Sequence, residues 1–209
     1  MEKVTVSYPG QAVAALQELS LRISPGVTLV KGASGAGKST LLRLLAGLLQ
    51  PAEGRVCHPW QRAGAAFYAR VGYLPQAAWV DQALTVEGGM RYLAGTRGLP
   101  AKVVGPVLER WELEGFRRQR LDRLSGGTAR RWLLAQSQLT NPALWLLDEP
   151  LSGLDAAGVV TLKRELARYR AAAASGRQRY AVAAVQDDRL DDLAVRIFWL
   201  DRGRLRCWM

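Results

Sequence analysis

The sequence predicts an α/β domain built around a mainly parallel β-sheet. Two short apolar runs end abruptly in polar residues: ALWLLDEP ends at Asp148 and Glu149, and AVAAVQDD ends at Gln186 and two aspartates. Short runs of this kind, apolar on both faces, are typical of strands that are covered on both sides in a parallel sheet. Ligands bind at the carboxyl ends of the strands in such sheets. The polar residues that end these strands are therefore the first candidates for a functional site.

Length and composition fit one substantial domain with an anionic neighbour. The chain has 209 residues, and its 29 Lys and Arg outnumber its 18 Asp and Glu to give a net charge of +11. Such a charge favours a polyanion or an anionic membrane surface. We expect a solvated face to account for most of the basic residues, including a dense set in the middle of the chain: Arg117, Arg118, Arg120, Arg123, Arg130 and Arg131.

Cysteine and histidine are too scarce to build a disulfide framework or a zinc site. Cys57 and Cys207 lie far apart in the sequence, which fits a reducing compartment. His58 is the single histidine, and with Cys57 it offers two ligands where a structural zinc site takes four. We expect His58 to be a surface loop residue.

No segment has the pattern of a secretory signal or a membrane span. The first ten residues, MEKVTVSYPG, lack a continuous apolar core, and no stretch approaches about 20 apolar residues. The most apolar candidate, STLLRLLAGLL, is interrupted by Arg43 and predicts a buried amphipathic helix. We expect a soluble protein, and because the sequence ends with FWLDRGRLRCWM we expect no carboxyl-terminal regulatory domain.

The segment VTLVKGASGAGKSTLLRLLAGLL contains a phosphate-binding P-loop between a strand and a helix. The pattern G-x-x-x-x-G-K-[ST] is met by Gly32, Gly37, Lys38 and Ser39. Glycines let backbone N–H groups converge on phosphate oxygens, and the following helix directs its positive end there. Lys38 would neutralise phosphate charge, and the Ser39 hydroxyl would ligate Mg²⁺.

The carboxylates at the end of ALWLLDEP are the expected partners of a P-loop. One of them, Asp148, would hold Mg²⁺ directly or through water, and Glu149 could accept a proton from an attacking water molecule. Taken alone, the pair could also cap a turn. The P-loop in the same chain favours the catalytic interpretation.

The middle of the chain, residues 77–136, predicts helices. Helical periodicity is visible in VEGGMRYLAGTRGL and in KVVGPVLERWEL, and no flexible linker separates this part from its flanks. We therefore expect a helical subdomain inserted into a nucleotide-binding core made of residues 1–76 and 137–209. Residues 171–175, AAAAS, predict a helix end followed by a loop.

The segment RLSGGTARRWLLAQSQL resembles the signature motif of ABC-type ATPases, the nucleotide-binding subunits of ABC transporters. The likeness spans nearly the whole chain in the order of that family: Tyr8, GASGAGKST, YLPQ ending at Gln76, LSGGT, LWLLDEP, and LSGLD ending at Asp155. It implies one ABC ATPase domain with a P-loop NTPase core, a small antiparallel β region near the N-terminus and the inserted helical subdomain.

The resemblance implies roles for individual residues. Tyr8 would stack on adenine, although it could equally be a packing residue, and Gln76 would reach Mg²⁺ and the attacking water from a loop that also senses the membrane partner. The signature residues would bind the γ-phosphate held by a second, antiparallel subunit, so that two ATP molecules are sandwiched in a dimer. The implied nucleotide contacts are Tyr8, Gly32, Ala33, Ser34, Gly35, Ala36, Gly37, Lys38, Ser39, Thr40, Ser125, Gly126, Gly127 and Asp155.

Two positions depart from the family pattern. Gln186 stands where the family has a histidine that holds the γ-phosphate, and Thr128 stands where the signature usually continues with glutamine. Glutamine can donate and accept hydrogen bonds but cannot carry a proton. We expect ATP binding to be largely intact and hydrolysis, with Glu149 as base, to be slower.

The resemblance implies the ATP-binding and ATP-hydrolysing subunit of an ABC membrane transporter, acting with ATP and Mg²⁺. It would form a homodimer or heterodimer and lie on the inner face of the membrane through a separate permease, with no specific nucleic acid partner. LTVEGGMRYLAGTRGLP resembles the helical region of export-type ATPases, so export is the expected direction.

Two alternatives stay open. The positive charge fits a soluble ABC ATPase that acts on DNA or ribosomes, although such relatives usually carry inserted coiled coils or zinc modules. Gln186 and Thr128 fit a degenerate binding-only subunit, although the presence of Lys38, Asp148 and Glu149 opposes it.

Overall fold

The computed structural model describes residues 1–10, 13–60, 64–76 and 83–207. A six-stranded sheet forms its centre, with strand order β5-β6-β7-β3-β8-β9, and only β9 runs antiparallel to its neighbour. Its strands are β3 (Gly26–Lys31), β5 (Val71–Leu74), β6 (Leu144–Asp148), β7 (Tyr180–Val185), β8 (Arg196–Asp201) and β9 (Arg204–Cys207). The expected mainly parallel sheet is confirmed.

A second, three-stranded antiparallel sheet lies near the N-terminus, as expected. It has the order β2-β1-β4, from β1 (Glu2–Val6), β2 (Leu16–Leu19) and β4 (Glu53–Arg55). The α-helices are α1 (Lys38–Leu45), α2 (Ala65–Tyr68), α3 (Val86–Thr96), α4 (Val104–Arg110), α5 (Gly126–Ser137) and α6 (Ala156–Ala174). Short 3₁₀ turns are η1 (Ala101–Val103), η2 (Glu114–Phe116), η3 (Leu121–Arg123) and η4 (Asp191–Leu193).

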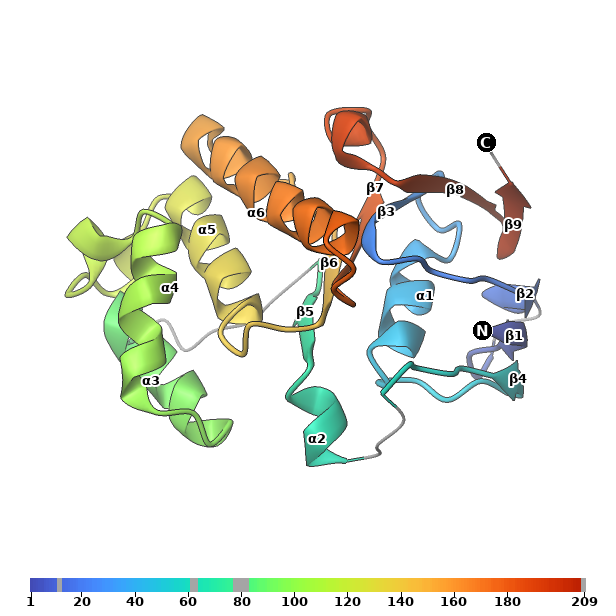
Figure 1. Ribbon diagram of the computed structural model, residues 1–209, viewed down its shortest axis with the longest axis horizontal. Coiled ribbons are helices and arrows are strands. Elements are labelled where there is room, and N and C mark those ends of the chain that lie inside the picture. Colours follow the sequence, from blue (N-terminus) through green and yellow to red (C-terminus); the bar gives the residue numbers. More distant parts are fainter. Residues whose placement is uncertain (11–12, 61–63, 77–82, 208–209) are drawn as a thin grey trace.

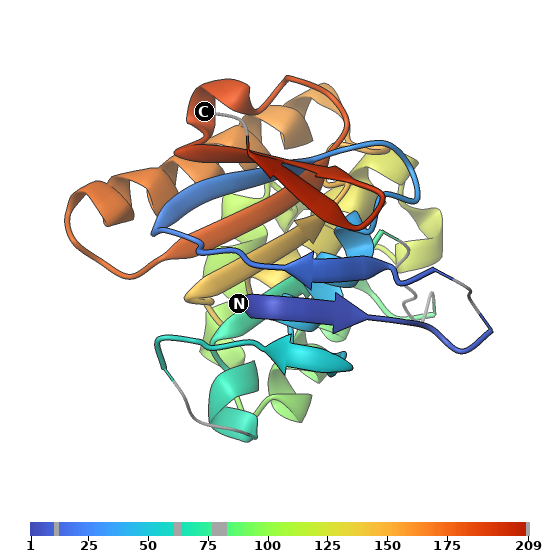
Figure 2. The same cartoon turned by 90° about the vertical axis from the view of Figure 1, so that its right-hand side faces the viewer.

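The two faces of the central sheet bury different hydrophobic clusters, because successive side chains of a strand point to opposite faces. Val27 and Leu29 of β3 belong to the cluster that includes α6, whereas Val30 belongs to the cluster around α1 and the small sheet. The layers are therefore the small sheet, α1, the central sheet and α6 (Figures 1 and 2). This packing leaves the carboxyl ends of β3, β6 and β7 beside the first turn of α1.

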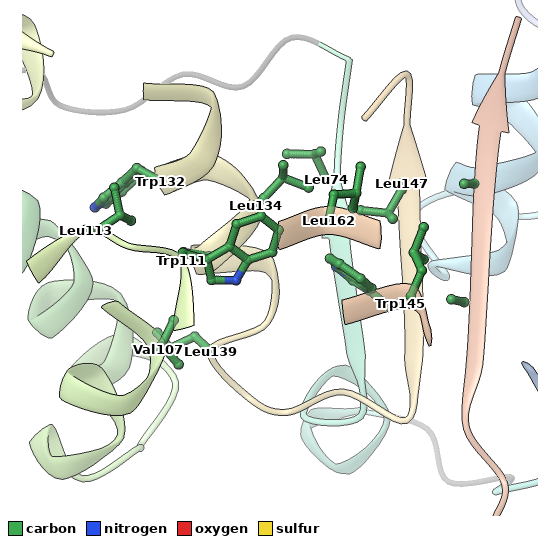
Figure 3. Close-up of a cluster of buried hydrophobic side chains, with 14 of the residues drawn as sticks. Leu74, Val107, Trp111, Leu113, Trp132, Leu134, Leu139, Trp145, Leu147 and Leu162 are labelled. Carbon is green, nitrogen blue, oxygen red and sulfur yellow. The ribbon is translucent and has the colours of Figure 1, made fainter. Parts of the chain in front are cut away.

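Helices α3, α4 and α5 lie together at one side of the molecule (Figure 1). Three fully buried tryptophans, Trp111, Trp132 and Trp145, connect this side to the central sheet (Figure 3). Each indole N–H has a partner: Gln138 Oε1 at 3.0 Å, the Val86 carbonyl at 3.0 Å and Ser137 Oγ at 2.8 Å, respectively. The helical segments expected here are confirmed, and one continuous core joins them to β6 and α6.

Two expectations about polar residues hold only in part, since most of the arginines in the middle of the chain are exposed or partly exposed and His58 lies in a loop. Arg130 and Arg131 do not lie on a solvated face, because their residues are only 8% and 7% exposed. His58 is half-buried: its ring contacts Phe67 with centroids 4.7 Å apart, and burial lowers the pKa of its imidazole. In both cases, packing in the folded chain covers side chains that are polar in the sequence.

Within the described ranges, no helix combines the length and the apolar character needed to cross a membrane.

Candidate nucleotide site

The loop between β3 and α1 can be built only with glycine at two positions. Gly32 has a φ of 152° and Gly37 a φ of 104°, both in the region that side chains disfavour. A Cβ on Gly32 would lie 2.2 Å from the Leu200 carbonyl oxygen, and one on Gly37 would lie 2.6 Å from that of Ala15. The loop therefore packs closely against β8 and the segment before β2, with its backbone directed to the start of α1.

Lys38 occupies the first turn of α1 and is buried, with 6% of its side chain exposed. Its Nζ donates hydrogen bonds to the carbonyls of Gly32 at 2.7 Å and Ala33 at 3.0 Å. The same Nζ lies 3.7 Å from Glu149 Oε1. A buried ammonium held at the mouth of the loop can neutralise the charge of a bound phosphate.

The acidic pair lies at the end of β6, where the sequence predicts it. Asp148 is 1% exposed, and its Oδ1 is a buried oxygen with no hydrogen-bond partner among the described residues. Glu149 follows in a left-handed backbone conformation with a φ of 47°, which costs on the order of 1 kcal/mol for a residue other than glycine. This conformation ends the strand and directs the two carboxylates differently.

Gln186 follows β7 and reaches Glu149. Its Nε2 donates a hydrogen bond to Glu149 Oε1 at 2.9 Å, and its side chain is exposed. The two residues meet because β6 and β7 are parallel neighbours with Asp148 opposite Ala184. Gln186 therefore lies beside the acidic pair, as its place at the carboxyl end of β7 predicts.

A cavity of about 460 Å³ joins these groups. Eleven residues predicted for the site line it: Tyr8, Ser34, Gly35, Gly37, Lys38, Ser39, Thr40, Gln76, Asp148, Glu149 and Gln186. The Tyr8 hydroxyl lies 3.3 Å from Thr40 Oγ1. Gly32, Ala33 and Ala36 belong to the same loop but are not in the lining.

A larger cavity of about 710 Å³ lies elsewhere and has none of this chemistry. Its lining includes Leu144 and Tyr180, the first residues of β6 and β7, so it opens at the amino ends of the strands. Ligands of parallel sheets bind at the carboxyl ends. The smaller cavity is therefore the candidate nucleotide site.

Four further predicted residues, which lie outside the loop, are also absent from the lining of this cavity: Ser125, Gly126, Gly127 and Asp155. Ser125 caps α5, with its Oγ accepting from the Thr128 backbone N–H at 3.3 Å. Asp155 caps α6 and forms an ion pair with Arg131 at 3.3 Å. Gly127 packs against Asp155, because a Cβ there would lie 2.8 Å from that of Asp155. These residues form a separate surface beside the cavity in the same chain.

Sequence reasoning missed three charged residues near the site. Arg202 lines the cavity from the tight turn between β8 and β9, where its φ is 47°. Lys31, at the end of β3, is buried and pairs with Asp188 at 2.5 Å and Asp191 at 2.6 Å. Arg130 donates hydrogen bonds to carbonyls at the ends of β5 and β6. The sequence holds a signal for two of them. Arg202 belongs to the turn sequence DRGR, and Lys31 is a charged residue at the end of an apolar strand.

The donor set fits Mg²⁺. Asp148, which has a carboxylate oxygen without a hydrogen-bond partner among the described residues, lines the same cavity as Ser39 and Gln76. Oxygen ligands of this kind suit Mg²⁺. Such an ion would supply charge neutralisation for the phosphates of a bound nucleotide.

Three features together define an ATP-binding cassette. A P-loop connects β3 to α1, an acidic pair ends β6, which lies two strands from β3 in the sheet, and Ser125 caps the helix that carries the signature motif. The family model described as "ABC transporter" matches residues 16–152, and the chain belongs to that family.

Known proteins resemble the chain over most of its length. The ATP-binding/permease protein Rv1747 of Mycobacterium tuberculosis is 42% identical over 73% of this chain and 19% of its own length. The zinc import ATP-binding proteins ZnuC of Pseudomonas savastanoi and Halorhodospira halophila are 38% and 34% identical, over 81% and 99% of this chain and 61% and 75% of their own lengths. The chain thus spans about a fifth of the first relative and about three fifths of the second.

Solved structures show the same fold. The dimeric structure of MJ0796, a bacterial ABC transporter cassette, has a TM-score of 0.81 and 23% identity, and the match covers 98% of this chain and 95% of that one. An ATP-binding subunit of an ABC transporter has a TM-score of 0.83 and 21% identity, with 99% and 87% covered. The expected P-loop NTPase core of the cassette type is confirmed.

The expectation of export has no support among these relatives. Several of the similar proteins are named as zinc import proteins. Likeness of the helical segment to export-type ATPases is therefore not enough to assign the direction of transport.

Proposed function

We propose that this chain binds and hydrolyses ATP with Mg²⁺ and works as the ATP-binding subunit of a membrane transporter. The observation that carries the proposal is the convergence of Lys38, Asp148, Glu149 and Gln186 on one cavity at the carboxyl ends of three neighbouring strands. Lys38 would contact the terminal phosphates. Asp148, Ser39 and Gln76 would hold Mg²⁺.

Glu149 is the proposed general base. Its Oε1 accepts a hydrogen bond from Gln186 and lies near Lys38 Nζ, so its carboxylate is fixed beside the phosphate-binding loop. Water attacking the γ-phosphorus would transfer a proton to this carboxylate. Gln186 would orient the base and the water through its amide but take no proton.

The surface formed by Ser125, Gly126, Gly127 and Asp155 supports a dimeric arrangement. These residues lie outside the cavity of their own chain, and the N-terminus of α5 carries a partial positive charge that suits a phosphate group. In an antiparallel dimer, this surface would close the nucleotide site of the other subunit. The similar structure of MJ0796 is described as dimeric, which supports the proposal.

Transport would require a separate membrane protein. A groove lined by apolar residues such as Leu49 and Phe67 and by the polar side chains of Gln50 and Arg55 is open to solvent, and the exposed Leu48 and Tyr68 belong to the same region. This mixed surface supports docking of a permease. Through that permease the chain would lie on the inner face of the membrane. The similar proteins named for zinc import favour uptake over export.

The test is ATPase activity of the purified chain with and without Mg²⁺, followed by capture of membrane partners that raise that activity. Stimulation by a co-purified multispanning protein is the expected result. Stimulation by a DNA or RNA of defined structure at physiological salt would instead support a soluble nucleic-acid ATPase. Weak salt-sensitive binding of nucleic acid carries no weight, since a net charge of +11 is enough to produce it.

A further inference from the structure

Arg130 is a buried arginine on helix α5 whose partners are all main-chain carbonyls. Its guanidinium donates to the carbonyl of Glu149 at 2.8 Å, that of Asp148 at 3.2 Å and that of Gln76 at 3.4 Å. One side chain therefore connects the signature helix to the ends of both β5 and β6. These two ends carry the residues proposed to hold Mg²⁺ and to act as base.

Placing this charge inside the protein is costly, because it has no direct carboxylate partner to offset its desolvation. Burial lowers the pKa of the guanidinium, and the charges of Asp148 and Glu149 oppose that effect from a distance. Among the described residues its Nε has no hydrogen-bond partner. Because Arg130 has no direct carboxylate partner, it adds little to the stability of the fold through an ion pair. Its contribution is to fix the main-chain carbonyls that it binds.

Glu149 is the residue that most needs such fixing. Its backbone is left-handed, and its N–H donates to the Ala184 carbonyl at 3.0 Å. Arg130 binds the carbonyl at the other side of the same residue. With both main-chain groups held, the side chain of Glu149 is directed to Gln186 and Lys38.

We infer that Arg130 is a positioning residue, and that through it the orientation of Glu149 depends on the position of helix α5. When α5 is in its present place, the guanidinium binds the main-chain carbonyls of both Glu149 and Gln76. A displacement of α5 would draw the guanidinium from these carbonyls and release the base. Hydrolysis is thereby linked to the position of the helix that carries Ser125, Gly126 and Gly127. This inference rests on the proposed ATPase function.

The experiment compares Arg130→Gln and Arg130→Lys with Arg97→Gln as a matched control. Arg97 also donates to a main-chain carbonyl of α5, that of Gln136 at 3.1 Å, but lies outside the cavity lining. For each variant, kcat, KM and the equilibrium affinity for ATP are measured, together with the melting temperature.

We expect Arg130→Gln to lower kcat by about 10- to 100-fold while ATP affinity changes less than about threefold, since a misplaced base affects chemistry and not ground-state binding. Arg130→Lys should recover part of kcat, because an ammonium can still donate to the Glu149 carbonyl. Arg97→Gln should leave kcat unchanged.

A double-mutant cycle separates positioning from general stability. In a Glu149→Gln background, Arg130→Gln should have little further effect on the residual single-turnover rate, because the base on which it acts is gone. Independent, multiplicative losses would overturn the inference, and so would an unchanged kcat in Arg130→Gln or parallel losses of kcat and ATP affinity. A wild-type chain that binds ATP without hydrolysing it would overturn the proposed function instead.

Discussion

Gln186 donates a hydrogen bond from its amide to the carboxylate of Glu149 over 2.9 Å, joining the ends of two parallel strands. The resemblance to ABC-type ATPases implies a histidine at the position of Gln186, beside the proposed base Glu149. A neutral amide can hold the carboxylate and orient water, but it gives no charged contact to the γ-phosphate. We therefore expect hydrolysis with weaker stabilisation of the transition state.

Changes at Gln186 should therefore alter turnover more than binding. We expect Gln186→Ala to lower kcat by up to about tenfold, because it removes a hydrogen bond worth ~1 kcal/mol to the base. Gln186→His should raise kcat, since an imidazolium adds a charge-assisted contact. Steady-state ATPase assays and ATP titrations measure the two effects separately. If Gln186→Ala left kcat and affinity unchanged, the amide would be only a polar strand end.

Lys38→Ala should weaken ATP binding. The ammonium is buried at the phosphate-binding loop, and a charge-assisted contact contributes about 1.5–3 kcal/mol, so affinity should fall roughly ten- to hundredfold. Isothermal titration of Mg-ATP measures the change. The exposed Lys102 serves as control, since Lys102→Ala should bind ATP as the wild type does. If wild type, Lys38→Ala and Lys102→Ala bound Mg-ATP with equal affinity, the assignment of the loop as a phosphate-binding site would be wrong.

Glu149→Gln should accumulate a dimer in the presence of ATP. The amide keeps the shape of the side chain but cannot accept the proton of the attacking water, so ATP stays bound between the subunits. Size-exclusion chromatography with light scattering measures the dimer fraction. Glu87→Gln is the control, because Glu87 pairs with Arg91 at the surface of α3, away from the cavity. A Glu149→Gln chain that remains monomeric at saturating ATP would count against the dimeric site.

Lys31 predicts a pH dependence of stability. Burial alone would lower the pKa of its ammonium, but the hydrogen bonds and charges of Asp188 and Asp191 outweigh it, so the pKa is raised above the ordinary value of 10.5. Because the folded state binds this proton more tightly, the stabilisation is fully present below pH 10.5 and is lost as the pH rises through the raised pKa.

Denaturant unfolding of wild type and Lys31→Met at neutral pH and at a pH above that raised value measures this contribution. The difference in the free energy of unfolding between the two proteins should shrink at the higher pH. Lys102→Met, at an exposed position, should show no such change relative to wild type. A Lys31→Met difference that is constant with pH would mean that only the aliphatic stem of Lys31 contributes.

Local patterns in the sequence were enough to predict the parallel sheet, the phosphate-binding loop, the acidic pair and the signature helix. Each depends on residues that are close along the chain: the glycines before Lys38, the carboxylates that end β6, and Ser125 as the cap of α5. Backbone geometry and capping are local, so a short segment is sufficient to specify them.

Tertiary structure alone decided which of these groups meet and how they are held. Gln186 and Glu149 are 37 positions apart in the sequence, and their pairing follows from the register of β6 and β7. Arg130 had the pattern of a solvated basic residue, yet the packing of α5 against the ends of β5 and β6 buries it against the carbonyl of Glu149. The sequence by itself determined the chemical groups and their local backbone, whereas burial and long-range register, which depend on segments distant in the chain, determined their partners.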